Sequence, residues 1–142
     1  MRVLGPCPDI VPGRGGNDNS FVLHLRLGAR SALLVGDAER EQESDLLRLG
    51  PAMLRADLLK VGHHGSKTST STAFLDAVAP RDAVITSGVR NRYGHPTPET
   101  LEVLRQRRVR VFRSDRHGAV RWETDGESVW VTTVVGRPPE GS

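Results

Sequence analysis

Hydrophobic and polar residues alternate along residues 21–27, which is typical of a half-buried β-strand. One face of this strand holds Phe21, Leu23, Leu25 and Leu27, and the other holds Val22, His24 and Arg26. Residues 31–37, "SALLVGD", instead form a short continuous apolar run, which predicts an inner strand covered on both faces. Gly28 lies between the two segments and predicts an antiparallel hairpin.

Short helices and strands then alternate along the rest of the chain. The first helix is expected at Glu41–Leu49, with Leu46, Leu47 and Leu49 facing inward and Gly50-Pro51 ending it. Two later helices are expected at residues 71–79, capped by Ser or Thr, and 97–108, capped by Thr97 with Pro98 at its first position. Strands are expected at residues 2–4, 56–62, 82–88, 109–114, 118–124 and 128–135.

This order of elements predicts an α/β domain with a mixed β-sheet flanked by helices. The chain has 142 residues, which suits one domain with one core. We expect residues 1–135 to form that domain and residues 136–142 to form a flexible C-terminal tail.

Charge is uneven along the chain. The net charge is +3, and eighteen of the twenty basic residues are arginine. Ten arginines and four acidic residues lie between Arg81 and Arg121, a local net charge of +6. A basic half favours an anionic partner such as DNA, although a solvated arginine-rich surface gives the same pattern.

Cysteine content and hydropathy exclude several classes of protein. The single cysteine, Cys7, excludes an internal disulfide and a multi-thiolate metal site, so any metal would need histidine and carboxylate ligands. No apolar run approaches the roughly 20 residues of a membrane span. The first sixteen residues do not resemble a signal peptide. We expect a soluble chain without membrane contact of its own, cytoplasmic if it is expressed alone.

Candidate catalytic chemistry lies where three predicted inner strands end. One strand ends at Asp37, the next at His63 and His64, and the third runs into a loop that contains His95. Strand ends at one edge of a layered α/β sheet collect binding and catalytic groups. Imidazole and carboxylate donors suit Zn²⁺ or Mn²⁺. The alternative is that these side chains cap helices or satisfy loop amides.

Three segments together resemble the C-terminal part of the metallo-β-lactamase-like domain of ComEC-type DNA-uptake proteins. They are "NDNSFVLHLRLGARSALLVGDAE", "LLKVGHHGSKTSTSTAFLDAVAP" and "AVITSGVRNRYGHPTPETLEVL", which follow in order with matching gaps over about residues 1–125. The resemblance implies a four-layer αββα sandwich, of which this chain supplies about half. It also implies a metal-dependent hydrolase site that acts on phosphodiesters.

The resemblance also implies roles for individual residues. Asp37 matches an aspartate that can bridge two metals. Of His63 and His64, one would be a metal ligand and the other would contact the phosphate or donate a proton to the leaving group. His95 would be a further catalytic residue at the rim. The implied substrate-binding residues are Ser66, Lys67, Asn91, Arg92 and Tyr93.

The chain departs from the family pattern because it lacks the HxHxDH motif that supplies most metal ligands. His24 and His117 stand alone and are expected to be structural or exposed. Either a segment of the same or another chain supplies the missing half, or the chain is a non-catalytic remnant that binds DNA or protein. We expect no hydrolysis by the isolated chain, and an uncovered sheet face that favours a partner or a homodimer. The resemblance also implies a setting, because the domains that this chain resembles are attached to a membrane channel protein.

Overall fold

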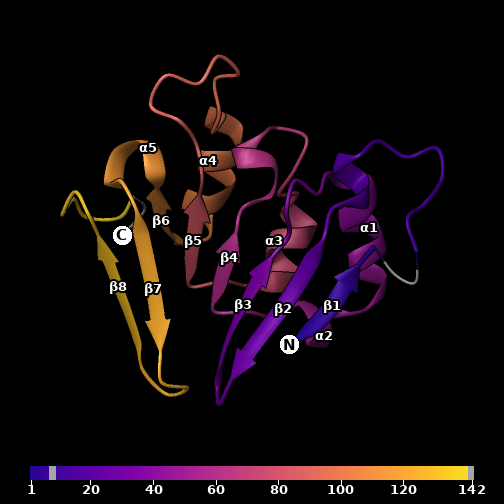
Figure 1. Ribbon diagram of the computed structural model, residues 1–142, viewed down its shortest axis with the longest axis horizontal. Helices are drawn as coiled ribbons and strands as arrows, with labels where there is room; N and C mark the ends of the chain where they lie inside the picture. The colour runs from indigo at the N-terminus through magenta and orange to yellow at the C-terminus, as the bar shows by residue number, and fades with distance from the viewer. Residues whose placement is uncertain (7–8, 141–142) are drawn as a thin grey trace.

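Six strands form one mixed sheet in chain order in the computed structural model, which describes residues 1–6 and 9–140 (Figure 1). They are β1 (Arg2–Gly5), β2 (Val22–Leu27), β3 (Arg30–Leu34), β4 (Leu58–Lys60), β5 (Asp82–Ile85) and β6 (Arg110–Arg113). The pairs β1–β2 and β2–β3 are antiparallel, whereas β3 to β6 run parallel. The remaining strands, β7 (Val120–Thr124) and β8 (Val129–Thr133), form a separate antiparallel hairpin.

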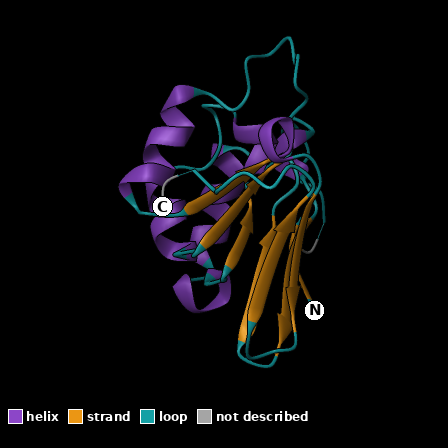
Figure 2. Cartoon of the chain, turned by 90° about the vertical axis from the view of Figure 1, so that its left-hand side faces the viewer, coloured by secondary structure: helices purple, strands orange, loops and turns teal. Residues whose placement is uncertain are grey.

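The helices are α1 (Arg40–Arg48), α2 (Pro51–Leu54), α3 (Thr72–Val78), α4 (Pro98–Gln106) and α5 (Ser114–His117), with 3₁₀ turns η1 (Asn17–Asn19) and η2 (Gly62–Gly65). Helices α1 to α4 connect the parallel strands and lie on one side of the sheet, whereas α5 follows β6 and leads to the β7–β8 hairpin (Figure 2). Leu33, Leu59 and Ile85 of the sheet are fully buried together with Leu46 and Phe74 of the helices. The predicted α/β class, with a mixed sheet flanked by helices, is confirmed.

Local capping explains where two of the predicted helices begin. The Ser71 hydroxyl accepts a hydrogen bond from the amide of Phe74, and the Thr97 hydroxyl accepts one from the amide of Thr100. Pro98 is the first helical residue of α4, as predicted. One inward position was predicted wrongly: Leu49 is 46% exposed because α1 ends at Arg48 and the chain turns outward there.

The sheet face opposite the helices is apolar and only partly covered. Val22 of β2 is fully buried on the helix side, whereas Phe21 and Leu27, from the leucine-rich face, are 62% and 55% exposed. The β7–β8 hairpin covers part of this face, and a hollow of about 320 Å³ remains between Leu25, Leu34 and Trp122. The alternation in β2 is therefore present, but its more apolar face is the one that the helices do not cover.

Three features at the ends of the fold bear on the predictions. His117 is 1% exposed and accepts a hydrogen bond from the amide of Arg113, so it is structural. In the segment predicted as a tail, Glu140 exchanges both backbone hydrogen bonds with Val111 of β6. Cys7 and the last two residues of the predicted tail lie outside the described residues.

Across residues 1–6 and 9–140, no helix combines the length and apolarity needed to cross a membrane.

Candidate functional site

The candidate site lies at the edge of the sheet where the parallel strands end. Asp37 follows β3, His63 and His64 form η2 directly after β4, and His95 lies in the long loop after β5. The rings of His63 and His95 are 5.7 Å apart between centroids, and those of His63 and His64 are 6.3 Å apart. The fold thus brings together side chains that are up to 58 residues apart in sequence.

The two neighbouring histidines adopt a backbone conformation that non-glycine residues rarely use. Their φ angles are 42° at His63 and 54° at His64, both in the left-handed region. Each such residue costs on the order of 1–3 kcal/mol, and such residues concentrate at functional sites. The flanking glycines permit close packing, because a Cβ at Gly62 would lie 2.7 Å from the Ala38 carbonyl oxygen and one at Gly65 would lie 2.6 Å from Pro96.

His64 is oriented so that one ring nitrogen faces Asp37. Its Nδ1 lies 2.6 Å from the carbonyl oxygen of Thr86. A carbonyl oxygen only accepts hydrogen bonds, so Nδ1 carries the proton and Nε2 has a free lone pair. That Nε2 lies 3.6 Å from Oδ1 of Asp37. The backbone of Asp37 is held by its amide, which donates to the hydroxyl of Ser20.

His63 is held by a carboxylate on the other side of the site. Its Nδ1 lies 2.6 Å from Oε1 of Glu39, so Nδ1–H donates to the carboxylate and Nε2 is again left free. Oε1 of Glu39 also accepts from Thr68 Oγ1 at 2.9 Å and from Asn17 Nδ2 at 3.3 Å. Burial alone would raise the pKa of Glu39, but these donors outweigh it, and the pKa lies below its usual range.

Lys60 supplies a cation to the same site. Its Nζ donates to the carbonyl oxygen of Gly36 at 2.7 Å and lies 3.7 Å from Oδ1 of Asp37. Burial lowers the pKa of Lys60, and the nearby carboxylate of Asp37 offsets only part of this effect. The ammonium group of Lys60 is therefore held beside Asp37 by its hydrogen bond to Gly36 as well as by the attraction between the two charges.

His95 contributes a buried polar atom that makes no hydrogen bond to the described residues. Its Nδ1 is shielded from solvent, and its ring stacks on Tyr93 with 6.1 Å between centroids. Burial lowers the pKa of His95, and a positive charge on His63 or His64 would lower it further. An open pocket of about 430 Å³ lies beside it, lined by His64, Thr86, Ser87, Asn91, Tyr93 and His95.

The predicted substrate-binding residues differ in how they are placed. Tyr93 is 66% exposed and lines the pocket, with the Arg92 guanidinium 5.0 Å from its ring centroid. Asn91 also lines the pocket, but both ends of its amide bond the backbone of His95. Ser66 is 5% exposed and its hydroxyl bonds Thr68, whereas Lys67 is exposed and makes no side-chain ion pair within the described part of the chain.

Several residues of this site escaped the sequence-based prediction. Glu39 is an acidic residue of a kind usually found at the surface, and Thr68 is a hydroxyl residue shortly before a predicted helix. Asn17 lies in a loop, where an Asx turn is the usual interpretation. The local sequence pattern predicts only that Lys60 is a strand residue. It gives no sign that the ammonium group reaches Asp37. The only local signal was that Glu39 lies two residues after Asp37.

Part of a metal-binding geometry is present. Two donors to one tetrahedral Zn²⁺, each about 2.0–2.2 Å from the ion, lie about 3.4 Å apart. The 3.6 Å between Asp37 Oδ1 and His64 Nε2 fits such a pair. Within residues 1–6 and 9–140, no group of three or more His, Cys, Asp or Glu side chains could hold a metal ion. The described residues therefore present two donors at a spacing that one shared Zn²⁺ would require.

The sequence matches no protein-family model, but it is similar to individual proteins. It is 41% identical over 123 residues to ComE operon protein 3 of Bacillus subtilis (strain 168), covering 86% of this chain and 15% of that protein. It is 37% identical over 106 residues to competence protein ComA of Neisseria gonorrhoeae, with 75% and 15% covered. It is 39% identical over 114 residues to recombination protein 2 of Haemophilus influenzae (strain ATCC 51907 / DSM 11121 / KW20 / Rd), with 80% and 14% covered.

One of these three relatives is named for competence, and the three matches cover 75–86% of the chain's own length. The chain spans about 15% of the length of the curated relatives it matches. The similarity thus concerns one segment of much longer proteins.

Proposed function

We propose that the chain is the C-terminal part of a metallo-β-lactamase-like domain and contributes half of a metal-dependent phosphodiesterase site in a DNA-uptake system. The observation that carries this proposal is the orientation of His64. Its Nδ1 donates to the Thr86 carbonyl, and its Nε2 faces Asp37 at a distance that suits a shared ion. The similarity to competence proteins supports the association with DNA uptake.

Asp37 and His64 would hold the ion, with Lys60 next to Asp37. Zn²⁺ or Mn²⁺ at this position would supply a nucleophile near neutral pH and a positive charge beside the phosphate. His63 is held by Glu39 in the manner in which carboxylates orient catalytic or metal-binding imidazoles. In the imidazolium form, in which both ring nitrogens carry a proton, its Nε2–H would contact the phosphate or donate a proton to the leaving group. His95 and Tyr93 would position the substrate in the adjoining pocket.

The partner in this proposal is a segment that carries the HxHxDH motif, in the same or another chain. Two observations support it: the site holds two fitting donors, and a leucine-rich sheet face is only partly covered by the β7–β8 hairpin. A β-sheet packed on that face would complete a four-layer αββα sandwich and place further ligands near Asp37. Sheet-on-sheet packing of this kind buries the alternate residues of both inner faces.

The uncovered face should make the isolated chain associate at high concentration. Leu27 is 55% exposed on this face, so Leu27→Asp should lower the average mass in concentration-dependent light scattering toward that of a monomer. Leu49→Asp is the matched control, because Leu49 is 46% exposed on a helical surface, and it should leave the mass unchanged. A strictly monomeric unmutated chain that also forms no complex with an HxHxDH segment would contradict this part of the proposal.

Nuclease activity tests the proposal itself. A 5′-labelled single-stranded DNA should be cleaved in Mn²⁺ when the chain is mixed with a polypeptide that carries the HxHxDH segment, and not by either component alone. Asp37→Ala should abolish cleavage, whereas Asp76→Ala should retain it, because Asp76 is an exposed carboxylate that pairs with Arg107 and lines neither the pocket beside the candidate site nor the pocket at the opposite edge of the sheet. Cleavage by the Asp37→Ala variant at the unmutated rate would refute the assigned site.

A second candidate function is a non-catalytic DNA-binding remnant of the same domain. The observation that favours it is the pair of donors without a third within the described residues. It predicts that the mixture forms a complex and binds DNA but does not cleave it with any added metal. If the mixture formed a complex but did not cleave DNA in that experiment, the result would support the non-catalytic remnant over the enzyme.

A further inference from the structure

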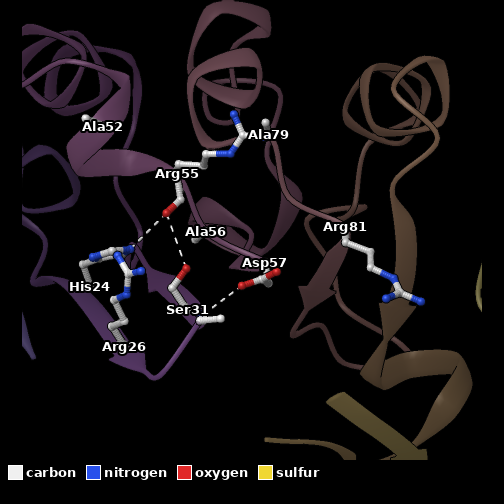
Figure 3. Close-up of a pocket in the computed structure, with 10 residues that line it drawn as sticks. His24, Arg26, Ser31, Ala52, Arg55, Ala56, Asp57, Ala79 and Arg81 are labelled. Carbon is white, nitrogen blue, oxygen red and sulfur yellow. Dashed lines mark hydrogen bonds between the residues drawn. The ribbon is translucent and has the colours of Figure 1, made fainter. Parts of the chain in front are cut away.

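A second pocket lies at the opposite edge of the sheet, where the parallel strands begin. It has a volume of about 320 Å³ and is bordered by the end of β2, the start of β3, the segment between α2 and β4, and the turn before β5 (Figure 3). Its small residues Ala29, Ala52 and Ala79 leave it open. None of the residues of the proposed metal site lines it.

Arginine side chains dominate the charge of this pocket. Arg26, Arg55 and Arg81 line it and are exposed. Within residues 1–6 and 9–140, none of the three forms an ion pair with a carboxylate, and Arg26 donates only to the carbonyl oxygen of Gly28. Other arginines do pair: Arg107, for example, makes two hydrogen bonds to Asp76. The pocket therefore holds three cationic groups without an anionic partner among the described residues.

The carboxylate in the pocket is already engaged. Asp57 accepts a hydrogen bond from the amide of Ser31 at 2.8 Å and pairs with Arg30 at 3.3 Å. The ring of His24 bonds the carbonyl oxygen of Arg55 at 3.1 Å, which fixes the backbone that carries this arginine. The charge of Asp57 is thus largely offset by Arg30, and the three lining arginines determine the sign of the pocket.

We propose that this pocket binds backbone phosphates of a single nucleic-acid strand. Guanidinium groups present planar donors that match phosphate oxygens. Exposed arginines without carboxylate partners keep these donors available for a phosphate. The labelled arginines do not converge: Arg55 extends toward Ala79, whereas Arg81 extends away from Asp57 (Figure 3). Cations spread around a pocket in this way suit successive phosphates of a strand better than one small anion.

This proposal goes beyond the proposed hydrolase function because it concerns a different edge of the sheet and requires no metal. The strands between the two edges are three to five residues long, which separates the edges by roughly 10–17 Å. A strand bound here would contact the domain outside the candidate catalytic site. Failure of catalysis and failure of this site can therefore be told apart by measuring binding in EDTA.

Fluorescence anisotropy with a labelled single-stranded oligonucleotide tests the proposal. The double variant Arg55→Ala/Arg81→Ala should bind at least about tenfold more weakly at low salt. The slope of log K against log salt should fall in magnitude by about 1.4, the value for two lost phosphate contacts to a single strand. Both side chains are exposed, so thermal unfolding of the variant should match that of the unmutated chain.

The matched control is Arg108→Ala/Arg137→Ala, which removes the same charge from two exposed arginines that lie outside the pocket. This control should bind DNA within about twofold of the unmutated chain. Equal weakening of both double variants would show that net charge alone drives binding and would overturn the proposal. It would also be overturned if millimolar inorganic phosphate displaced the oligonucleotide far better than sodium chloride at equal ionic strength, because that result indicates a site for one small anion.

Discussion

Replacing His64 by alanine should weaken the binding of Zn²⁺ or Mn²⁺ to the complex of the chain with an HxHxDH segment by at least about 100-fold. Mutation of a residue that merely orients a metal ligand typically costs 10- to 100-fold in metal affinity, so loss of a ligand should reach the upper end of that range or more. His64 is the residue whose free Nε2 faces Asp37 at 3.6 Å. Competitive titration against a chelator, followed by calorimetry, measures the affinity directly.

The matched control for this prediction is His24→Ala. His24 is also a partly exposed histidine at a strand, but its ring bonds the Arg55 carbonyl at the opposite edge of the sheet. Its removal should leave the metal affinity unchanged. If His24→Ala weakened binding as much as His64→Ala, the metal would be held by scattered surface histidines and the assigned pair would be wrong.

Asp82→Ala should destabilise the fold by about 1–3 kcal/mol, because it removes a buried carboxylate that accepts hydrogen bonds from a partly exposed arginine and a tryptophan. Asp82 is 1% exposed in β5, and its Oδ1 accepts hydrogen bonds from Arg110 of β6 at 2.7 Å. Its other oxygen accepts from the indole nitrogen of Trp122 at 3.1 Å. The carboxylate therefore joins two strands of the main sheet to the β7–β8 hairpin. Urea denaturation followed by circular dichroism measures the loss.

A control for the stability measurement is Asp76→Ala. Asp76 also makes a paired contact with an arginine, Arg107, but its side chain is 57% exposed. Solvent screens such surface pairs, so this variant should unfold close to the midpoint of the unmutated chain. Equal destabilisation by the two substitutions would mean that burial does not set the strength of the Asp82 cluster.

The order of the strands and of the longer helices, and the starts of two helices, could be predicted because their signals are local, whereas the short helices α2 and α5 were not predicted. Ser71 and Thr97 cap helices through their own side chains, and Pro98 fits the first helical position. The continuous apolar run before Asp37 identifies a strand without any knowledge of its neighbours. The same runs locate the strand ends, and hence the positions of Asp37 and His64 on one edge.

Contacts made at long range could not be predicted in the same way. Glu39 reaches His63 across 24 residues, and Lys60 reaches Asp37 through a side chain that local pattern assigns to the sheet. The alternation in β2 also could not predict which of its two faces the helices cover, because both faces carry apolar residues. The position of the helices decides which face is buried, and Val22 lies beneath them.

Asn17 illustrates the same limit on the other side of the site. Its loop composition favours a local Asx turn. In the structure its amide donates to Glu39 at 3.3 Å, and the neighbouring Asp18 accepts from the amides of Glu39 and Gln42 at the start of α1. A loop that reads as a linker therefore supports the carboxylate that orients His63.

The central claim is that His64 holds a metal through Nε2 while its Nδ1 remains protonated. Long-range ¹H–¹⁵N correlation spectra of the imidazole rings, recorded with and without Zn²⁺ on the complex of the chain with an HxHxDH segment, test it most directly. The account predicts that Nε2 of His64 shifts on addition of Zn²⁺, that its Nδ1 keeps the resonance of a protonated nitrogen, and that His24 and His117 do not change. Zn²⁺-saturated spectra in which His64 is unaltered would contradict it.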